Sequence, residues 1–433
     1  MRLAFVGVDA LGCLVGCGGR DGGGGTGGDG GSGSGGSGGA GGSGGSASQQ
    51  PVSLAAGAQH VCALFDDGGV RCWGNNSDGQ LGIGSTESIG DDEQVSEGQP
   101  VPLEEPAIAL DAGRAHTCVL LESHRIQCWG NNTVGQLGIG SKETIGDDEP
   151  VSDGGFAQVG GEVAQMSAGA SHVCALLTNG SLRCWGLSMA GELGYGNLDT
   201  IGDDEAPSMA GDVPVGFNPQ HIWAGFFRTC AWDAQQVACW GINNVGQLGR
   251  GNTDNVGDDE PASAGSVSPG FGLEAVGGGI AHTCFVGTGG ELKCVGAGMD
   301  GQLGSGGTDD LGDDEPLSSV SALMVGEVIK VTGGQRHTCA LKADGTIRCW
   351  GAGDAGQLGK GDTLSVDAAD ATSDLDLPKA TDLACTMMSC CALTGEGVRC
   401  WGSGDNGVLG TGSTDAIGDD EPARSGQAVR FAP

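Results

Sequence analysis

The sequence predicts an all-β protein, a seven-bladed β-propeller of four-stranded antiparallel blades whose ring is closed by the chain termini. Three observations predict this fold. A unit that runs from His60 to Gly82 recurs seven times, at intervals of 52 to 56 residues. Each copy contains four short apolar runs separated by turns. Glycine makes up 90 of the 433 residues, which disfavours long helices because each helical glycine costs about 1 kcal/mol relative to alanine. Repeats of this size, each built of short strands, are typical of propeller blades.

The second copy illustrates the expected strands. Its first short run is Ile108 to Leu110, its second is His116 to Leu120, and a turn separates this from the third, Ile126 to Gly130. A fourth short piece closes each unit, as in Val101-Pro-Leu103 of the first copy. Gly-rich turns join the pieces, and no helical period is present.

The chain termini are expected to close the ring. The last piece, Val429 to Phe431, has no following repeat, and Val52 to Leu54 has no preceding fourth strand. We therefore expect the two to pair in one blade, which would remove two open sheet edges.

The first 50 residues differ from the rest of the chain. Arg2 precedes a short apolar run, Leu3 to Val15, and Leu14-Val15-Gly16-Cys17 resembles the lipobox of bacterial lipoproteins. In those proteins the cysteine is lipidated, so the resemblance implies a signal peptide over residues 1–17, lipidation of Cys17 and a lipid-anchored, extracytoplasmic place at the bacterial cell envelope. Residues 18–50 are almost wholly small and polar, which predicts a disordered tether. Residues 51–433 then form the propeller.

The repeat itself resembles a known family. The pattern G-x-x-H-T-C-A-L-x-x-D-G-x-x-x-C-W-G-x-N-x-x-G-Q-L-G, matched most fully from Gly334 to Gly359, is similar to the regulator of chromosome condensation repeat. The resemblance covers residues 51 to 433 and implies a seven-bladed propeller. It says less about function, since propellers host many activities.

Paired cysteines are the strongest chemical signal in the repeats. In each copy two cysteines nine or ten residues apart flank a turn, so they face each other on adjacent strands within disulfide reach. The predicted bridges are Cys62–Cys72, Cys118–Cys128, Cys174–Cys184, Cys230–Cys239, Cys284–Cys294, Cys339–Cys349 and Cys391–Cys400. Zinc held by His60, Cys62 and Cys72 is the alternative. Disulfides agree better than zinc with an extracytoplasmic location of the protein.

Two further cysteines lie in the last copy. Aligned on the sixth copy, Cys385 replaces Gly333 and Cys390 replaces Thr338. The simplest interpretation is an eighth bridge, Cys385–Cys390, and a Cys390–Cys400 pairing is the alternative.

The repeated histidines and tryptophans are interpreted as structural. A catalytic histidine is normally single, whereas a histidine recurs before the first cysteine in five copies and is replaced by Arg228 and Ser389 in the other two. The tryptophan after the second cysteine is expected to pack between blades. The residues are His60, His116, His172, His282 and His337, and Trp73, Trp129, Trp185, Trp240, Trp350 and Trp401.

An acidic motif, Gly-Asp-Asp-Glu, occurs in six copies. One interpretation is a turn whose carboxylates cap backbone N–H groups and solvate the rim. The other is one Ca²⁺ per loop, since this ion takes six to eight oxygen ligands. The residues are Asp91, Asp92, Glu93, Asp147, Asp148, Glu149, Asp203, Asp204, Glu205, Asp258, Asp259, Glu260, Asp313, Asp314, Glu315, Asp419, Asp420 and Glu421. No other cofactor is expected.

Charge and motif context narrow the function. The net charge of −36 has the wrong sign for nucleic acid or anionic membranes. Three G-x-G-x-x-G matches, such as Gly296 to Gly301, lack the following helix of a dinucleotide site. We expect a monomeric, non-enzymatic binding or scaffold protein with a protein partner. The alternatives are guanine-nucleotide exchange, by family analogy, and an envelope enzyme at the central channel, with unrepeated candidates His124, His221, Trp223, Arg228 and Trp232.

Overall fold

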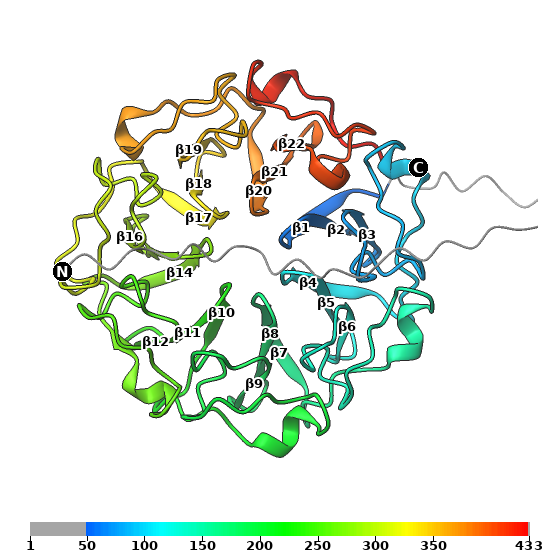
Figure 1. Ribbon diagram of the computed structural model, residues 1–433, viewed down its shortest axis with the longest axis vertical. Coiled ribbons are helices and arrows are strands. Elements are labelled where there is room, and N and C mark those ends of the chain that lie inside the picture. The colour runs from blue at the N-terminus through cyan, green and yellow to red at the C-terminus, as the bar shows by residue number, and fades with distance from the viewer. Residues whose placement is uncertain (1–48, 432–433) are drawn as a thin grey trace, which may run out of the picture. The chain divides into compact units, whose positions relative to one another are not determined.

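The computed structural model describes residues 49–431, which lie within one compact unit. The predicted signal peptide, Cys17 and nearly all of the tether lie outside these residues. The unit is built of seven antiparallel sheets arranged around a common centre, each formed by consecutive strands of one repeat (Figure 1). Within residues 49–431, no helix has the length and apolar character needed to cross a membrane.

The sheets are numbered here 1 to 7 in chain order. Their strands are β1 (Pro51–Ala56), β2 (His60–Phe65) and β3 (Val70–Gly74); β4 (Ala107–Ala112), β5 (His116–Leu121) and β6 (Ile126–Gly130); β7 (Val163–Ala168), β8 (His172–Leu177) and β9 (Leu182–Gly186); β10 (His221–Ala224), β11 (Arg228–Trp232), β12 (Val237–Gly241) and β13 (Ser266–Val267); β14 (Leu273–Gly278), β15 (His282–Gly287) and β16 (Leu292–Gly296); β17 (Val328–Gly333), β18 (His337–Lys342) and β19 (Ile347–Gly351); β20 (Ala380–Cys385), β21 (Ser389–Thr394) and β22 (Gly397–Gly402).

Short 3₁₀ helices occur in the connections after the third strands. They are η1 (Val95–Glu97), η2 (Val151–Gly154), η3 (Pro207–Ala210), η4 (Ala262–Ala264), η5 (Ala369–Ala371), η6 (Asp405–Gly407) and η7 (Ala423–Ser425). None exceeds four residues, in keeping with the glycine content.

Within residues 49–431, the prediction of four regular strands per blade is wrong for six of the seven sheets, and a fourth strand, β13, is present in sheet 4 alone. In sheet 1 the fourth piece makes one backbone hydrogen bond to the third strand, from Val101 N–H to the Val70 carbonyl (2.9 Å). The next residue is Pro102, which has no N–H to continue the ladder. The Leu103 N–H instead turns back to the Val101 carbonyl, as in a γ-turn.

The expectation that the two chain ends share one blade is also wrong. Val429 N–H donates to the Val398 carbonyl in sheet 7, whereas Leu54 pairs with Ala63 in sheet 1. The fourth piece of sheet 7 therefore comes from the same repeat as its third strand, β22, and not from the other end of the chain. The ends still adjoin, because the Phe431 ring lies 5.1 Å from that of Phe65, measured between centroids.

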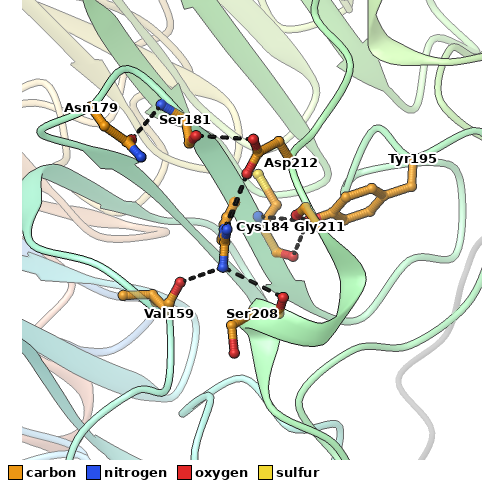
Figure 2. Close-up of polar contacts among 9 residues, drawn as sticks. Val159, Asn179, Ser181, Cys184, Tyr195, Ser208, Gly211 and Asp212 are labelled. Carbon is orange, nitrogen blue, oxygen red and sulfur yellow. Dashed lines mark hydrogen bonds and ion pairs between the residues drawn. The ribbon is translucent and has the colours of Figure 1, made fainter.

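Side chains on the outer part of sheet 3 hold the neighbouring chain segments in place. In sheet 3, Arg183 donates through Nη1 to the Val159 carbonyl (2.7 Å) and pairs through Nη2 with Asp212 (3.2 Å). Figure 2 shows Asp212 also bound by Ser181, and the Tyr195 hydroxyl between Cys184 and Gly211. Burial raises the pKa of Tyr195 to about 12, so this hydroxyl stays protonated and donates.

The hydrophobic core lies between neighbouring sheets. Its largest fully buried side chains are the six repeated tryptophans, and small or branched apolar residues of β2, β5 and their equivalents fill the space around them. The core of the last sheet continues into the first: Leu383 and Trp401 belong to the same buried cluster as Val61 and Trp73.

Candidate functional site

The structure joins all sixteen cysteines of residues 49–431 in eight disulfides. In each of the seven sheets the bridge joins opposed residues of the second and third strands, as in Cys62–Cys72, whose Cα atoms lie 4.0 Å apart. The remaining pairs are Cys118–Cys128, Cys174–Cys184, Cys230–Cys239, Cys284–Cys294, Cys339–Cys349, Cys391–Cys400 and the extra bridge Cys385–Cys390. Disulfide sulfurs offer no thiolate, so these pairs do not provide a zinc site.

The repeated histidines connect neighbouring sheets. Thr117 of sheet 2 donates its hydroxyl proton to the Gln80 carbonyl (2.8 Å), so His60 Nε2 must donate to the Thr117 oxygen, 2.9 Å away. His172 with Thr229 and His282 with Thr338 repeat this contact. These three histidines therefore make structural hydrogen bonds between neighbouring sheets.

The contact between sheets changes where the histidine or its threonine partner is replaced. Arg228 takes its place in sheet 4 and donates through Nε to Thr283 (2.6 Å). His116 lacks a partner at Nε2 because Val173 stands at the threonine position of sheet 3. Ser389 faces no threonine either, because sheet 1 carries Val61 there, and its hydroxyl bonds the Ser403 carbonyl instead.

Burial keeps these histidines neutral. It lowers the pKa of His60, His172 and His282 to about 3, and that of His116 and His337 to about 4. Nδ1 of His60 has no hydrogen-bond partner, so protonation there would bury an unpaired charge. An imidazole that stays neutral and fully buried does not act as an acid or base on a substrate.

The acidic loops lie where one sheet meets the next. The loop of sheet 2 begins at Gly146, whose carbonyl accepts from Gly84 N–H of the preceding repeat. Glu149 turns back and accepts the Gly146 N–H (3.1 Å). The same contact recurs at Glu93, Glu205 and Glu315. The last carboxylate of the motif is therefore a cap on its own loop.

The three carboxylates of each loop also lie close together. Burial and the neighbouring Asp148 raise the pKa of Glu149, and the glutamates of the other five loops are shifted in the same direction. Within the Asp147 to Glu149 loop, one oxygen from each side chain falls within 4.8 Å of the others. The geometry allows a cation, and the caps give the glutamate of the motif a structural role of its own.

The innermost strands of the seven sheets lie around a common centre (Figure 1). Residues of all seven of these strands line a cavity of about 410 Å³. Unrepeated side chains line it, including Asp111, Gln165, Glu274 and Lys330. Sequence reasoning missed these four because it followed the repeated positions. The sequence signal for them is a polar or charged residue in an innermost strand at a position where the other repeats have a different residue.

The carboxylates at the cavity tie sheets together. Asp111 Oδ2 accepts the Ala168 N–H of sheet 3 (2.9 Å), and burial raises the pKa of Asp111. Asp382 of sheet 7 accepts the Leu54 N–H of sheet 1 (2.8 Å) and pairs with Lys330 of sheet 6 (2.5 Å). The hydroxyls of Ser167 and Ser53 also donate to Asp111 (3.1 Å) and Asp382 (3.2 Å), so both carboxylates are engaged in bonds between sheets.

The unrepeated candidates predicted from sequence only partly converge. His221, Trp223 and Trp232 line the cavity, with the His221 and Trp232 rings stacked at 5.3 Å. The Arg228 guanidinium lies 5.2 Å from the Trp223 ring. His124 lies apart, bonded through Nδ1 to the Val163 carbonyl.

One face of the unit is built from corresponding loops of all seven sheets. The loop between the first two strands meets the turn after the third, as where Asn75 N–H donates to the Gln59 carbonyl. Neighbouring loops are joined as well: Ala58 N–H donates to the Arg114 carbonyl, and Met387 N–H of sheet 7 to the Ala58 carbonyl. We call this surface the loop face.

Sheets 3 to 5 make one sector of the loop face apolar. Met189 and Met299 are each 69% exposed, at a turn position where sheets 1 and 2 have Ser77 and Thr133. Partly exposed apolar residues accompany them. We call the set the apolar sector: Leu187, Met189, Phe226, Phe227, Ile242, Ile280 and Met299. Phe226 also lines the central cavity, so the sector reaches the cavity wall.

Seven contiguous antiparallel sheets, joined by repeated inter-sheet bonds, define a propeller-type repeat protein. The model of the RCC1-like domain matches residues 25–372. The chain belongs to this family, the regulator of chromosome condensation repeat proteins. The relatives share the fold, but their names describe different activities.

Among curated relatives, the ultraviolet-B receptor UVR8 of Arabidopsis thaliana is 30% identical over 83% of this chain and 79% of its own. The human E3 ubiquitin-protein ligase HERC2 is 28% identical over 78% of this chain, which spans only 7% of that protein. Of solved structures, Prp20p of Saccharomyces cerevisiae superposes with a TM-score of 0.63 at 22% identity, covering 87% of this chain and 86% of its own. Human WBSCR16 gives 0.64 at 19%, covering 81% and 92%. These two show a shared fold.

Proposed function

We propose that this protein is a non-enzymatic binding or scaffold propeller that presents its loop face to a protein partner. The apolar sector carries the proposal. Exposed apolar side chains gathered on one sector of a surface are typical of interaction sites. Methionines add to this, because their flexible side chains adapt to a partner.

The repeated polar residues support a non-catalytic role. The histidines and the carboxylates at the cavity are engaged between sheets within residues 49–431, where they hold the frame. The solved relative Prp20p is described by its binding to Gsp1p and histones, so partner binding occurs in a protein of this fold.

We further propose a single closed ring, acting as a monomer. The bonds between sheets 7 and 1 support it, since Gly412 N–H donates to the Gly90 carbonyl just as Gly84 N–H donates to the Gly146 carbonyl. The lipobox-like segment supports a lipid anchor at Cys17 and a place at the bacterial cell envelope. Disulfides in every sheet suit an oxidising, extracytoplasmic compartment.

Affinity capture from envelope extract tests the binding proposal. The baits are the full chain, the variant Met189→Ser with Met299→Ser, and a control, Met209→Ser with Met324→Ser, whose methionines are 76% and 81% exposed outside the apolar sector. We expect one protein to be enriched by the full chain and the control and lost with the sector variant. Equal capture by all three would contradict the proposal.

A second candidate function is an envelope enzyme that binds a small-molecule substrate at the central cavity, favoured by the unrepeated polar lining of this cavity. A ligand that raises the unfolding midpoint of the full chain, but not of Lys330→Met, would favour this candidate.

A further inference from the structure

Sheet 7 differs from the other sheets by its second disulfide, Cys385–Cys390, which lies between the ends of β20 and β21. Cys390 stands at the position where sheets 2, 4, 5 and 6 have a threonine that faces the preceding sheet. Its sulfur therefore lies against sheet 6, with Sγ 3.5 Å from Sγ of Cys339. Cys339 is itself bonded to Cys349. Sulfurs of two different bridges are thus in contact across the interface of two sheets.

A histidine accompanies this contact. His337 Nε2 lies 3.2 Å from Cys390 Sγ, in the place where His60, His172 and His282 meet a threonine oxygen. A neutral imidazole can donate its Nε2 proton to a thiolate at Cys390. Such a hydrogen bond to a charged acceptor is stronger than one between neutral groups and would favour Cys390 as a leaving group.

Access to the two bridges is unequal. Cys385 is 7% exposed and lines the central cavity, whereas Cys339 and Cys349 are fully buried. A small thiol that enters the cavity would therefore meet the Cys385 sulfur first.

We propose that these two bridges form a thiol–disulfide exchange centre that takes small thiols from the cavity. A thiolate attacks Cys385 Sγ, the Cys385–Cys390 bond breaks, and Cys390 leaves as a thiolate. Cys390 then attacks Cys339 Sγ; the Cys339–Cys390 bond forms and Cys349 leaves as a thiolate that takes up a proton. A second thiolate then attacks the small-molecule sulfur of the mixed disulfide; the small disulfide forms, and Cys385 leaves as a thiolate that takes up a proton.

The electrons and atoms balance in this sequence. Two thiols are oxidised to one disulfide, and the protein gains two electrons and two protons as the thiols of Cys385 and Cys349. Two bridges within sheets become one bridge, Cys339–Cys390, between sheets 6 and 7. The centre thus converts a reducing signal into a covalent link between neighbouring sheets.

Tryptic mapping of the full-length protein tests the exchange. The protein is incubated with increasing reduced glutathione under native conditions, quenched with N-ethylmaleimide and digested. Cleavage after Arg336, Lys342, Arg348 and Lys379 places Cys339, Cys349 and Cys390 on three separate peptides. We expect peptide 337–342 to lose its link to 349–360 and gain one to 380–399. Alkylation of Cys385 and Cys390 with the first link intact would overturn the proposal, as would a protein that stays oxidised until it unfolds.

Two variants test the exchange without a reductant. Cys385→Ser leaves Cys390 as a free thiol, and we expect the 337–342 peptide to become linked to 380–399 with the free thiol moved to Cys349. A thiol that stays on Cys390 would overturn the proposal. Cys390→Ser, which frees Cys385 instead, is the matched control and should keep Cys339 linked to Cys349. Exchange in this control would contradict Cys390 as the attacking sulfur.

Discussion

The indole Nε1 of Trp73 donates to the backbone carbonyl of Val408 at 2.9 Å, although 335 residues separate the two along the chain. Trp73 belongs to sheet 1, and Val408 follows the last strand of sheet 7. Other repeated tryptophans make the same bond to the preceding repeat, as Trp129 does to Gln80 and Trp185 to Gln136. The junction between the last and first sheets is therefore built like the junctions inside the chain.

The C-terminal segment should contribute to stability through this junction. Removal of residues 427–433 deletes the Val429 hydrogen bond and the Phe431 contacts with Phe65 and Trp73. Burial of a phenylalanine contributes about 1.5–3 kcal/mol, so we expect a clearly lower thermal midpoint. Arg430→Ala, at an exposed position, is the control and should leave the midpoint unchanged. A truncated protein that melts with the full chain would contradict the role of this segment.

Stability should fall as the pH drops from 7 to 5.5. The buried histidines have a folded pKa of about 3 to 4, against about 6.5 when unfolded, so the unfolded chain binds more protons over this range. Stability from neutral histidines is present above pH 6.5 and lost below it, by up to about 1.4 kcal/mol per pH unit for each one.

Denaturant unfolding at several pH values measures this slope. His60→Gln should reduce it, because a glutamine does not titrate. The acidic loops act in the opposite direction, since a raised carboxyl pKa in the folded state favours folding as the pH falls toward it. The raised carboxyl groups are the same in the parent protein and in His60→Gln, so the difference between their two slopes isolates the histidine. Equal slopes for the two proteins between pH 7 and 5.5 would contradict the buried, neutral state of His60.

Eight disulfides predict a defined increase in the mass of the protein when it is alkylated after reduction. Protein isolated from the envelope, unfolded without reductant, should take up no alkylating reagent at Cys62, Cys72 or the fourteen other cysteines of residues 49–431. After reduction all sixteen should react, as intact-mass analysis would show. Free thiols at Cys62 and Cys72 would argue against the extracytoplasmic compartment.

The acidic loops are expected to respond to ionic strength and not to calcium in particular. Their glutamates already cap backbone N–H groups, and their clustered carboxylates repel one another. NaCl and CaCl₂ at matched ionic strength should therefore stabilise the fold equally, with no saturable heat in calorimetry. Saturable binding that loses one site in Asp147→Asn with Asp148→Asn would instead establish calcium sites.

Repetition decided how much of this structure could be predicted from the sequence. The seven sheets follow from a pattern repeated seven times, and the paired cysteines lie opposite each other because a turn separates them. The fourth strands were predicted wrongly because a tight turn ends the ladder after one bond, as at Leu103 in sheet 1 and at Val159 and Leu377 in sheets 2 and 6. Asp111 and Lys330 were missed because they depart from the repeat. The contact of Cys339 with Cys390 joins two repeats, which the spacing within one repeat does not reveal.

The central claim is that the seven repeats form one closed frame, and matched substitutions at two tryptophans test it most directly. Trp73→Phe and Trp185→Phe each remove the indole N–H that donates to a buried carbonyl of the preceding repeat. The two sites are matched, because sheets 1 and 3 have Val61 and Val173 in place of the threonine that also donates to this carbonyl in sheet 2. We predict that both substitutions lower the free energy of unfolding, measured with denaturant, by the same amount, about 1–3 kcal/mol. A loss for Trp185→Phe with none for Trp73→Phe would contradict the claim, because the last sheet would then not be joined to the first.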